Sequence, residues 1–154
     1  MDMHTLLVAT DFSQCSEAAF RMAKKLAQGF GAKIILLHVV NQRLVEQLAS
    51  HLQVSAETLW PEFRERAQLQ LGEFLKQVKP GKLDVEGMVA IGVPFQEIAV
   101  VARDLLADLV IMGGYGRGGR GAIEEVFFGS TAEKVVRLLP CPVLCVPLPV
   151  SREQ

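Results

Sequence analysis

The sequence lacks the features that mark nucleic-acid-binding and membrane-spanning proteins. Its 154 residues carry 16 Lys and Arg against 17 Asp and Glu, so there is no basic excess to attract a nucleic acid. No apolar run approaches the roughly 18–20 residues that span a bilayer, and the first residues lack the basic region of a signal peptide. We therefore expect a cytoplasmic protein that contacts neither nucleic acid nor membrane.

Cysteine is scarce, with three residues (Cys15, Cys141 and Cys145) and no CxxC pair. In an extended chain Cys141 and Cys145 would lie about 13 Å apart, too far for one disulfide or a shared metal. This usage predicts buried, reduced thiols. The chain also lacks a Ser-His-Asp order in a supporting motif, a metal-ligand spacing and a nucleophile elbow, so no catalytic site is predicted.

Half of the residues are apolar, and they alternate between short continuous runs and longer stretches with helical spacing. The continuous runs predict five strands: Thr5–Ala9, Lys33–Val40, Asp84–Ile91, Asp108–Met112 and Val143–Val146. The helical stretches are Ser16–Phe30 with Ser13 as its N-cap, a short helix through Leu44 and Leu48, a longer one from near Pro61 to Val78, Phe95–Leu106, and Ala132–Leu139. Such alternation predicts an open, doubly wound α/β fold with a parallel sheet and helices on both faces. We expect a single domain over residues 1–150 and a short polar tail over 151–154.

The most informative segment is glycine-rich, running from Met112 to Gly121 and followed by Gly129–Thr131. It lies between a predicted strand and a predicted helix, where backbone N–H groups and the helix dipole favour a phosphate. The hydroxyls of Ser130 and Thr131 add donors. No Gly-Lys-Ser/Thr occurs, which excludes a P-loop. Gly114–Gly119 matches G-x-G-x-x-G, but no acidic residue on a following strand could bind a ribose, which disfavours a dinucleotide site.

Asp11 directly follows the first predicted strand, as the glycine segment follows the fourth. In open α/β sheets, ligands bind at the carboxyl ends of the strands where the strand order reverses. If these two strands are neighbours there, Asp11 and the glycines line one crevice. His38, within an apolar strand, is interpreted as a core histidine with a satisfied hydrogen bond rather than a catalytic one.

The order and spacing of several segments together resemble the universal stress protein family over nearly the whole chain. The segments are Leu6–Ser13, Leu36–Val39, Gly92–Pro94, Ala107–Gly113, Gly129–Ser130 and Cys141–Val146. The resemblance implies the strand order 3-2-1-4-5. It also implies a homodimer formed through the last strand, Val143–Val146.

The ATP-binding branch of that family carries G-x2-G-x9-G-[ST], and two registers of this motif are open here. Gly116-x2-Gly119-x9-Gly129-Ser130 satisfies it literally. Alternatively, Gly113 and Gly116 begin the loop, which is then three residues longer. By resemblance, Asp11 would bond the adenine or ribose end of the nucleotide and Val39 would contact the base. The predicted binding set is Thr10, Asp11, Val39, Met112, Gly113, Gly116, Gly119, Gly129, Ser130 and Thr131.

The resemblance thus predicts a stress-response regulator or protective factor that binds ATP, with or without Mg²⁺. Two alternatives stay open. One is a stress protein that binds no nucleotide and acts by dimerisation and partner contact. The other is a slow ATPase.

Overall fold

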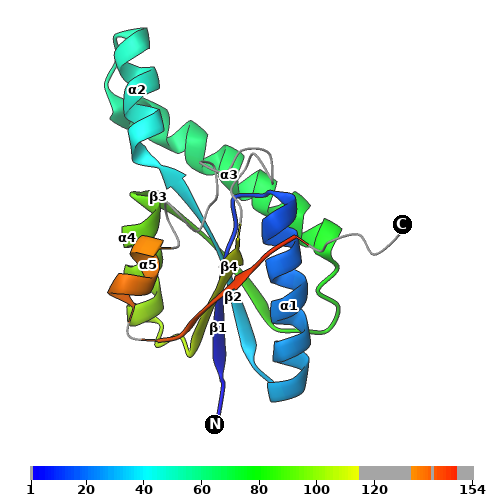
Figure 1. Cartoon of the computed structure of the whole chain (residues 1–154). Coiled ribbons are helices and arrows are strands. Elements are labelled where there is room, and N and C mark those ends of the chain that lie inside the picture. Colours follow the sequence, from blue (N-terminus) through cyan, green and yellow to red (C-terminus); the bar gives the residue numbers. More distant parts are fainter. Residues whose placement is uncertain (1, 115–132, 140, 149–154) are drawn as a thin grey trace, which may run out of the picture.

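A computed structural model describes residues 2–114, 133–139 and 141–148 of the chain, which form a doubly wound α/β fold (Figure 1). Five parallel strands make one sheet in the order β3-β2-β1-β4-β5, as predicted. The strands are β1 (Thr5–Ala9), β2 (Lys33–Asn41), β3 (Val85–Gly92), β4 (Leu109–Gly113) and β5 (Val143–Val146). The helices are α1 (Gln14–Phe30), α2 (Gln42–Leu52), α3 (Ala56–Val78), α4 (Pro94–Asp104) and α5 (Glu133–Leu138).

Two hydrophobic layers fix the helices on opposite faces of the sheet. On one face, α1 and α3 contribute Phe20 and Phe74 to a cluster with alternate residues of the central strands, such as Leu6. On the other face, α4 and α5 pack Ile98 and Val135 against the intervening strand residues. Because successive strand residues point to opposite faces, a central strand buried on both sides must be apolar throughout. This is why the continuous apolar runs predicted β1, β2 and β4.

The start of α3 differs from the expectation that this helix begins near Pro61. It begins at Ala56, and Pro61 lies inside it. The Ser55 hydroxyl accepts a hydrogen bond from the Glu57 N–H at 3.3 Å and so caps the helix. Phe63 then packs in a third apolar cluster beneath α2. The tertiary contact and the serine cap together outweigh the preference of proline for the first helical position.

One side chain, Asp108, ties the start of β4 to the start of β1. Its carboxylate accepts hydrogen bonds from the His4 N–H at 2.8 Å and the Thr5 N–H at 3.0 Å. These bonds favour the charged form, so they hold the pKa of the Asp108 carboxyl below its usual range. Asp108 therefore joins β1 and β4 at their amino ends, while Asp11 and Gly113 lie at the carboxyl ends of the same two strands.

Candidate functional site

The order in which strands are added to the sheet reverses between β1 and β4, and the carboxyl ends of these two strands lie side by side. From β1 the chain first adds β2 and β3 on one side, and then crosses to add β4 and β5 on the other. Val8 pairs with Ile111, so the residues that follow β1 and the end of β4 lie side by side at the edge of the sheet that is formed by the carboxyl ends of its strands. This is the position at which open α/β sheets hold their ligands. The structure thus brings together Asp11 and Gly113, as the sequence predicted.

The segment Thr10–Ser13, which links β1 to α1, is held by its own side chains. The Thr10 hydroxyl lies 2.8 Å from the Ser16 hydroxyl and accepts a hydrogen bond from the Phe12 N–H at 2.9 Å. The Asp11 carboxylate accepts one from the Ser13 N–H at 3.0 Å. Thr10 is only 6% exposed. Its hydroxyl therefore shapes the loop.

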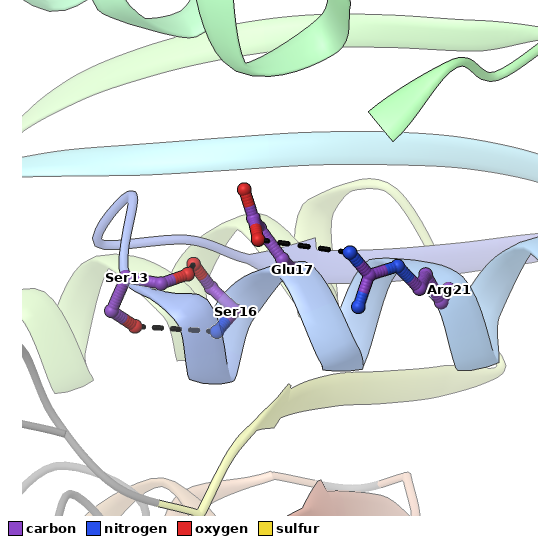
Figure 2. Close-up of polar contacts among 4 residues, drawn as sticks. All are labelled: Ser13, Ser16, Glu17 and Arg21. Carbon is purple, nitrogen blue, oxygen red and sulfur yellow. Dashed lines mark hydrogen bonds and ion pairs between the residues drawn. The ribbon is translucent and has the colours of Figure 1, made fainter. Parts of the chain in front are cut away.

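The first turn of α1 begins at this same edge. Ser13 is its N-cap, as predicted, and accepts a hydrogen bond from the Ser16 N–H at 3.2 Å (Figure 2). Glu17 lies in the first turn, where a negative charge suits the helix dipole, and it pairs with Arg21 at 3.8 Å. The Ser16 and Glu17 N–H groups are thus bonded to Ser13 within the helix start.

Gly113, at the end of β4, lies in close contact with Cys15 in the first turn of α1. A Cβ added to Gly113 would lie 2.8 Å from the Cys15 Cβ and 2.9 Å from the Cys15 carbonyl carbon. Real Cβ atoms do not approach neighbours this closely, so any side chain at this position would push α1 away. The glycine lets the first turn of the helix lie directly on the end of the strand. The neighbouring Gly114 has no such contact, and its N–H donates to the Val146 carbonyl.

Val39 and Met112 have different access to this edge. Val39 lies two residues beyond Leu37, the last β2 residue paired with β1, and is partly buried. It is therefore near enough to the edge to contact a ligand with its side chain. Met112 is fully buried in the cluster beneath α4 and α5. Only its backbone reaches the edge. The other predicted binding residues, Gly116, Gly119, Gly129, Ser130 and Thr131, lie outside the described residues.

His38 and Phe12 belong to this region although neither was among the predicted binding residues. His38 is 9% exposed, and its Nδ1 lies 2.8 Å from the Thr10 carbonyl oxygen. The interpretation of His38 as a satisfied core histidine is therefore confirmed. The Phe12 ring lies against the imidazole, tilted by 31°, with ring centroids 4.2 Å apart. Phe12 also lines a groove of about 310 Å³ along α3, together with Arg66, Leu69, Gln70, Glu73, Phe74 and Gln77.

The described part of the chain holds neither a metal-ligand cluster nor a helix long and apolar enough to cross a membrane. All three cysteines are free thiols, as predicted, and Cys15 is fully buried. Partial burial raises the pKa of the Cys141 and Cys145 thiols above their usual range, which keeps them protonated near neutral pH.

These features define a doubly wound α/β protein with a candidate ligand site where the strand order reverses. The model of the universal stress protein family matches residues 3–147, and the chain belongs to that family. Universal stress protein MJ0531 of Methanocaldococcus jannaschii is 33% identical over 150 residues, which cover 94% of this chain and 82% of MJ0531.

A second protein of that organism is similar in both sequence and structure. Universal stress protein MJ0577 is 28% identical over 153 residues, which cover 92% of this chain and 93% of MJ0577. Its solved structure matches with a TM-score of 0.80 at 26% identity, covering 98% of this chain and 100% of that one. The same fold thus extends over essentially the full length of both proteins.

Two further solved structures of this fold contain adenine nucleotides. A universal stress protein in complex with cAMP matches with a TM-score of 0.69 at 23% identity, covering 97% of this chain and 100% of that one. A universal stress protein from Archaeoglobus fulgidus in complex with dAMP has a TM-score of 0.64 at 20% identity, with coverage of 95% and 99%. At these identities the similarity concerns the fold.

Proposed function

We propose that this universal stress protein binds an adenine nucleotide, ATP in particular, at the carboxyl ends of β1 and β4. The observation that carries the proposal is the pairing of β1 with β4 at the point where the strand order reverses, with Asp11 and Gly113 at the shared edge. The complexes of two relatives of the same fold with cAMP and dAMP support it.

Each predicted residue has a distinct task in this proposal. The Asp11 carboxylate accepts hydrogen bonds from the ribose or adenine, Val39 contacts the base, and the backbone of Thr10, Met112 and Gly113 lies along the nucleotide. The glycine segment, through Gly116 or Gly119 with Gly129, Ser130 and Thr131, binds the phosphates by its N–H groups. Mg²⁺ that accompanies ATP takes most of its oxygen ligands from phosphates and water.

The proposed role is nucleotide-dependent regulation or protection under stress, in the cytoplasm, by a homodimer formed through β5. Binding rather than turnover is the activity proposed. Native mass spectrometry of the purified protein tests for a carried adenine nucleotide, and steady release of phosphate over hours would reveal an ATPase instead. Saturating ATP with Mg²⁺, at about 100 times the Kd, should stabilise the fold by roughly 2.7 kcal/mol.

Substitutions of Asp11 separate its two tasks. Asp11→Asn keeps an oxygen acceptor for the Ser13 N–H, whereas Asp11→Ala loses both this bond and the contact with the nucleotide. We expect Asp11→Ala to weaken ATP binding about tenfold or more, by removing a charge-assisted hydrogen bond, and Asp11→Asn to weaken it less. Asp104→Ala, at the exposed end of α4, is the matched control and should bind ATP normally.

A wild-type protein that carries no nucleotide and is not stabilised by ATP does not have this function, and a role through dimerisation and partner contact would replace it. ATP binding that is unaffected by Asp11→Ala would move the site away from the end of β1.

A further inference from the structure

We propose that His38 is a positioning residue for the nucleotide site: it holds the Thr10–Ser13 loop in the one conformation that presents Asp11 at the sheet edge. The inference rests on the proposed function, because Asp11 is its ligand-contacting residue. His38 itself lies on β2, behind the loop, and is 9% exposed. It would therefore act on the nucleotide through the loop rather than by contact.

The loop needs such support because Phe12 has an unfavourable backbone conformation. Its φ is +66°, in the left-handed region that a bulky residue rarely adopts. This conformation persists only when surrounding contacts impose it. The Phe12 N–H donates to the Thr10 hydroxyl at 2.9 Å, and the Phe12 ring lies 4.2 Å from the His38 ring and 6.0 Å from the Phe74 ring, centroid to centroid.

His38 also holds the residue on the other side of Asp11. A carbonyl oxygen can only accept, so the Nδ1 of His38 carries the proton that it shares with the Thr10 carbonyl at 2.8 Å. The Thr10 N–H meanwhile donates to the Leu37 carbonyl at 2.9 Å. Thr10 is therefore bound to β2 through both its N–H and its carbonyl group. Because β2 pairs with β1 and β3 on either side, this support is rigid.

Asp11 thus lies between two residues that the same imidazole holds, Thr10 by a hydrogen bond and Phe12 by ring contact. Its own carboxylate is oriented further by the Ser13 N–H. A side chain held in its binding geometry before the ligand arrives loses less conformational entropy on binding, and the affinity rises accordingly. His38 interrupts an otherwise apolar stretch of β2, and a buried polar group is stable there because its hydrogen bond is satisfied.

Three variants test the proposal. His38→Leu removes the donor and the aromatic ring while keeping an apolar side chain in the core. His38→Asn keeps an N–H donor near the position of Nδ1, so it should restore the bond to the Thr10 carbonyl. Val45→Ala is the control for lost stability, since Val45 is fully buried on α2, in a cluster that contains neither Phe12 nor His38.

Two measurements are made on each full-length variant: hydrogen exchange of the Phe12 and Ser13 N–H groups without nucleotide, and the Kd for ATP. We expect His38→Leu to speed exchange of both groups and to raise the Kd about tenfold, the effect of losing one hydrogen bond. His38→Asn keeps a donor for the Thr10 carbonyl and loses only the ring contact with Phe12, so its Kd should rise less than that of His38→Leu and stay within about threefold of wild type. Val45→Ala should match wild type in both measurements.

The outcomes that overturn the proposal are separate from failure of the proposed function. Unchanged exchange in His38→Leu means that His38 does not hold the loop. Faster exchange with an unchanged Kd means that the loop does not position the nucleotide contact. An equal rise in Kd in Val45→Ala means that the loss is one of general stability. If wild type binds no ATP, the proposed function fails and the inferred effect on binding fails with it, whereas the exchange data still decide whether His38 holds the loop.

Discussion

Gly113 sets the separation between α1 and β4 by having no side chain. The Cys15 Cβ occupies the space that a Cβ on Gly113 would need, so α1 lies directly on the end of the strand. The same helix carries the loop with Asp11 at its beginning. A change in the distance between α1 and β4 would therefore move Asp11 relative to the backbone of β4, and the two sides of the candidate site would no longer match.

We predict that Gly113→Ala destabilises the fold and weakens ATP binding, whereas Gly114→Ala does neither. Overpacking a tight contact costs about 1–3 kcal/mol, and the nearest atom to a Cβ on Gly113 is only 2.8 Å away. A Cβ on Gly114 would meet its nearest neighbour, the Pro147 Cα, at 3.4 Å. Chemical denaturation and ATP titration measure both effects. Equal stability of the two variants would show that α1 moves aside without cost.

Position in the sequence predicted which residues reach the edge, but not what their atoms do there. Asp11 and Gly113 each come at the end of an apolar run, and parallel strands place such ends together. The Thr10 hydroxyl turns inward because Ser16 and the Phe12 N–H bind it. The contact of Gly113 with Cys15 joins distant parts of the chain. Neither the inward Thr10 hydroxyl nor the Gly113–Cys15 contact can be predicted from the local sequence pattern, because both depend on how α1 packs on the sheet.

At the scale of whole elements, the strands were predicted better than the helix starts. Strand ends differ from prediction by a residue or so, since burial on both faces demands continuous apolar runs. The predicted start of α3 was wrong because more than one residue could begin a helix there. Ser55 and Pro61 each carry a start signal, and the helix begins after Ser55 because the serine cap and packing against α2 act together.

The position of Pro61 within α3 yields a test at this scale. Proline in a helix interior lacks the N–H that would bond the carbonyl four residues earlier, here that of Glu57. We predict that Pro61→Ala raises the free energy of unfolding, by up to about 3 kcal/mol. Pro94→Ala is the matched control, because Pro94 is in the first turn of α4, where no N–H is needed, and it should change stability little. Thermal unfolding measures both, and a lower Tm for Pro61→Ala would contradict the prediction.

At the scale of the whole molecule, the two outer strands of the sheet, β3 and β5, differ in charge. The edge strand β3 carries Glu86, which pairs with Lys33 at 3.0 Å, and the Val89 carbonyl accepts a hydrogen bond from Arg64 on α3 at 3.4 Å. Charged side chains of this kind discourage pairing with another sheet. The edge strand β5, Val143–Val146, has no charged residue. An uncharged edge strand is suited to pairing with a second copy, which favours β5 over β3 as the dimer interface.

The hydrogen bonds of β5 show which of its residues would pair with a second copy. The carbonyls of Pro142 and Val146 accept from β4, from the Val110 and Gly114 N–H groups. Backbone groups alternate in direction along a strand, so the N–H of Leu144 faces β4 and the N–H of Cys145 faces the open edge. A proline at Cys145 would therefore remove only an outward N–H, and a proline at Leu144 would remove one that bonds β4.

We predict that Cys145→Pro turns a dimer into a monomer while the fold survives. Sedimentation velocity under reducing conditions should find wild type and Cys145→Val dimeric, because valine keeps the outward N–H and removes only the thiol. Leu144→Pro should lower the Tm clearly more than Cys145→Pro, because it breaks the bond to β4. A wild-type monomer, or a Cys145→Pro variant that remains dimeric, would show that the chain does not dimerise by strand pairing at β5.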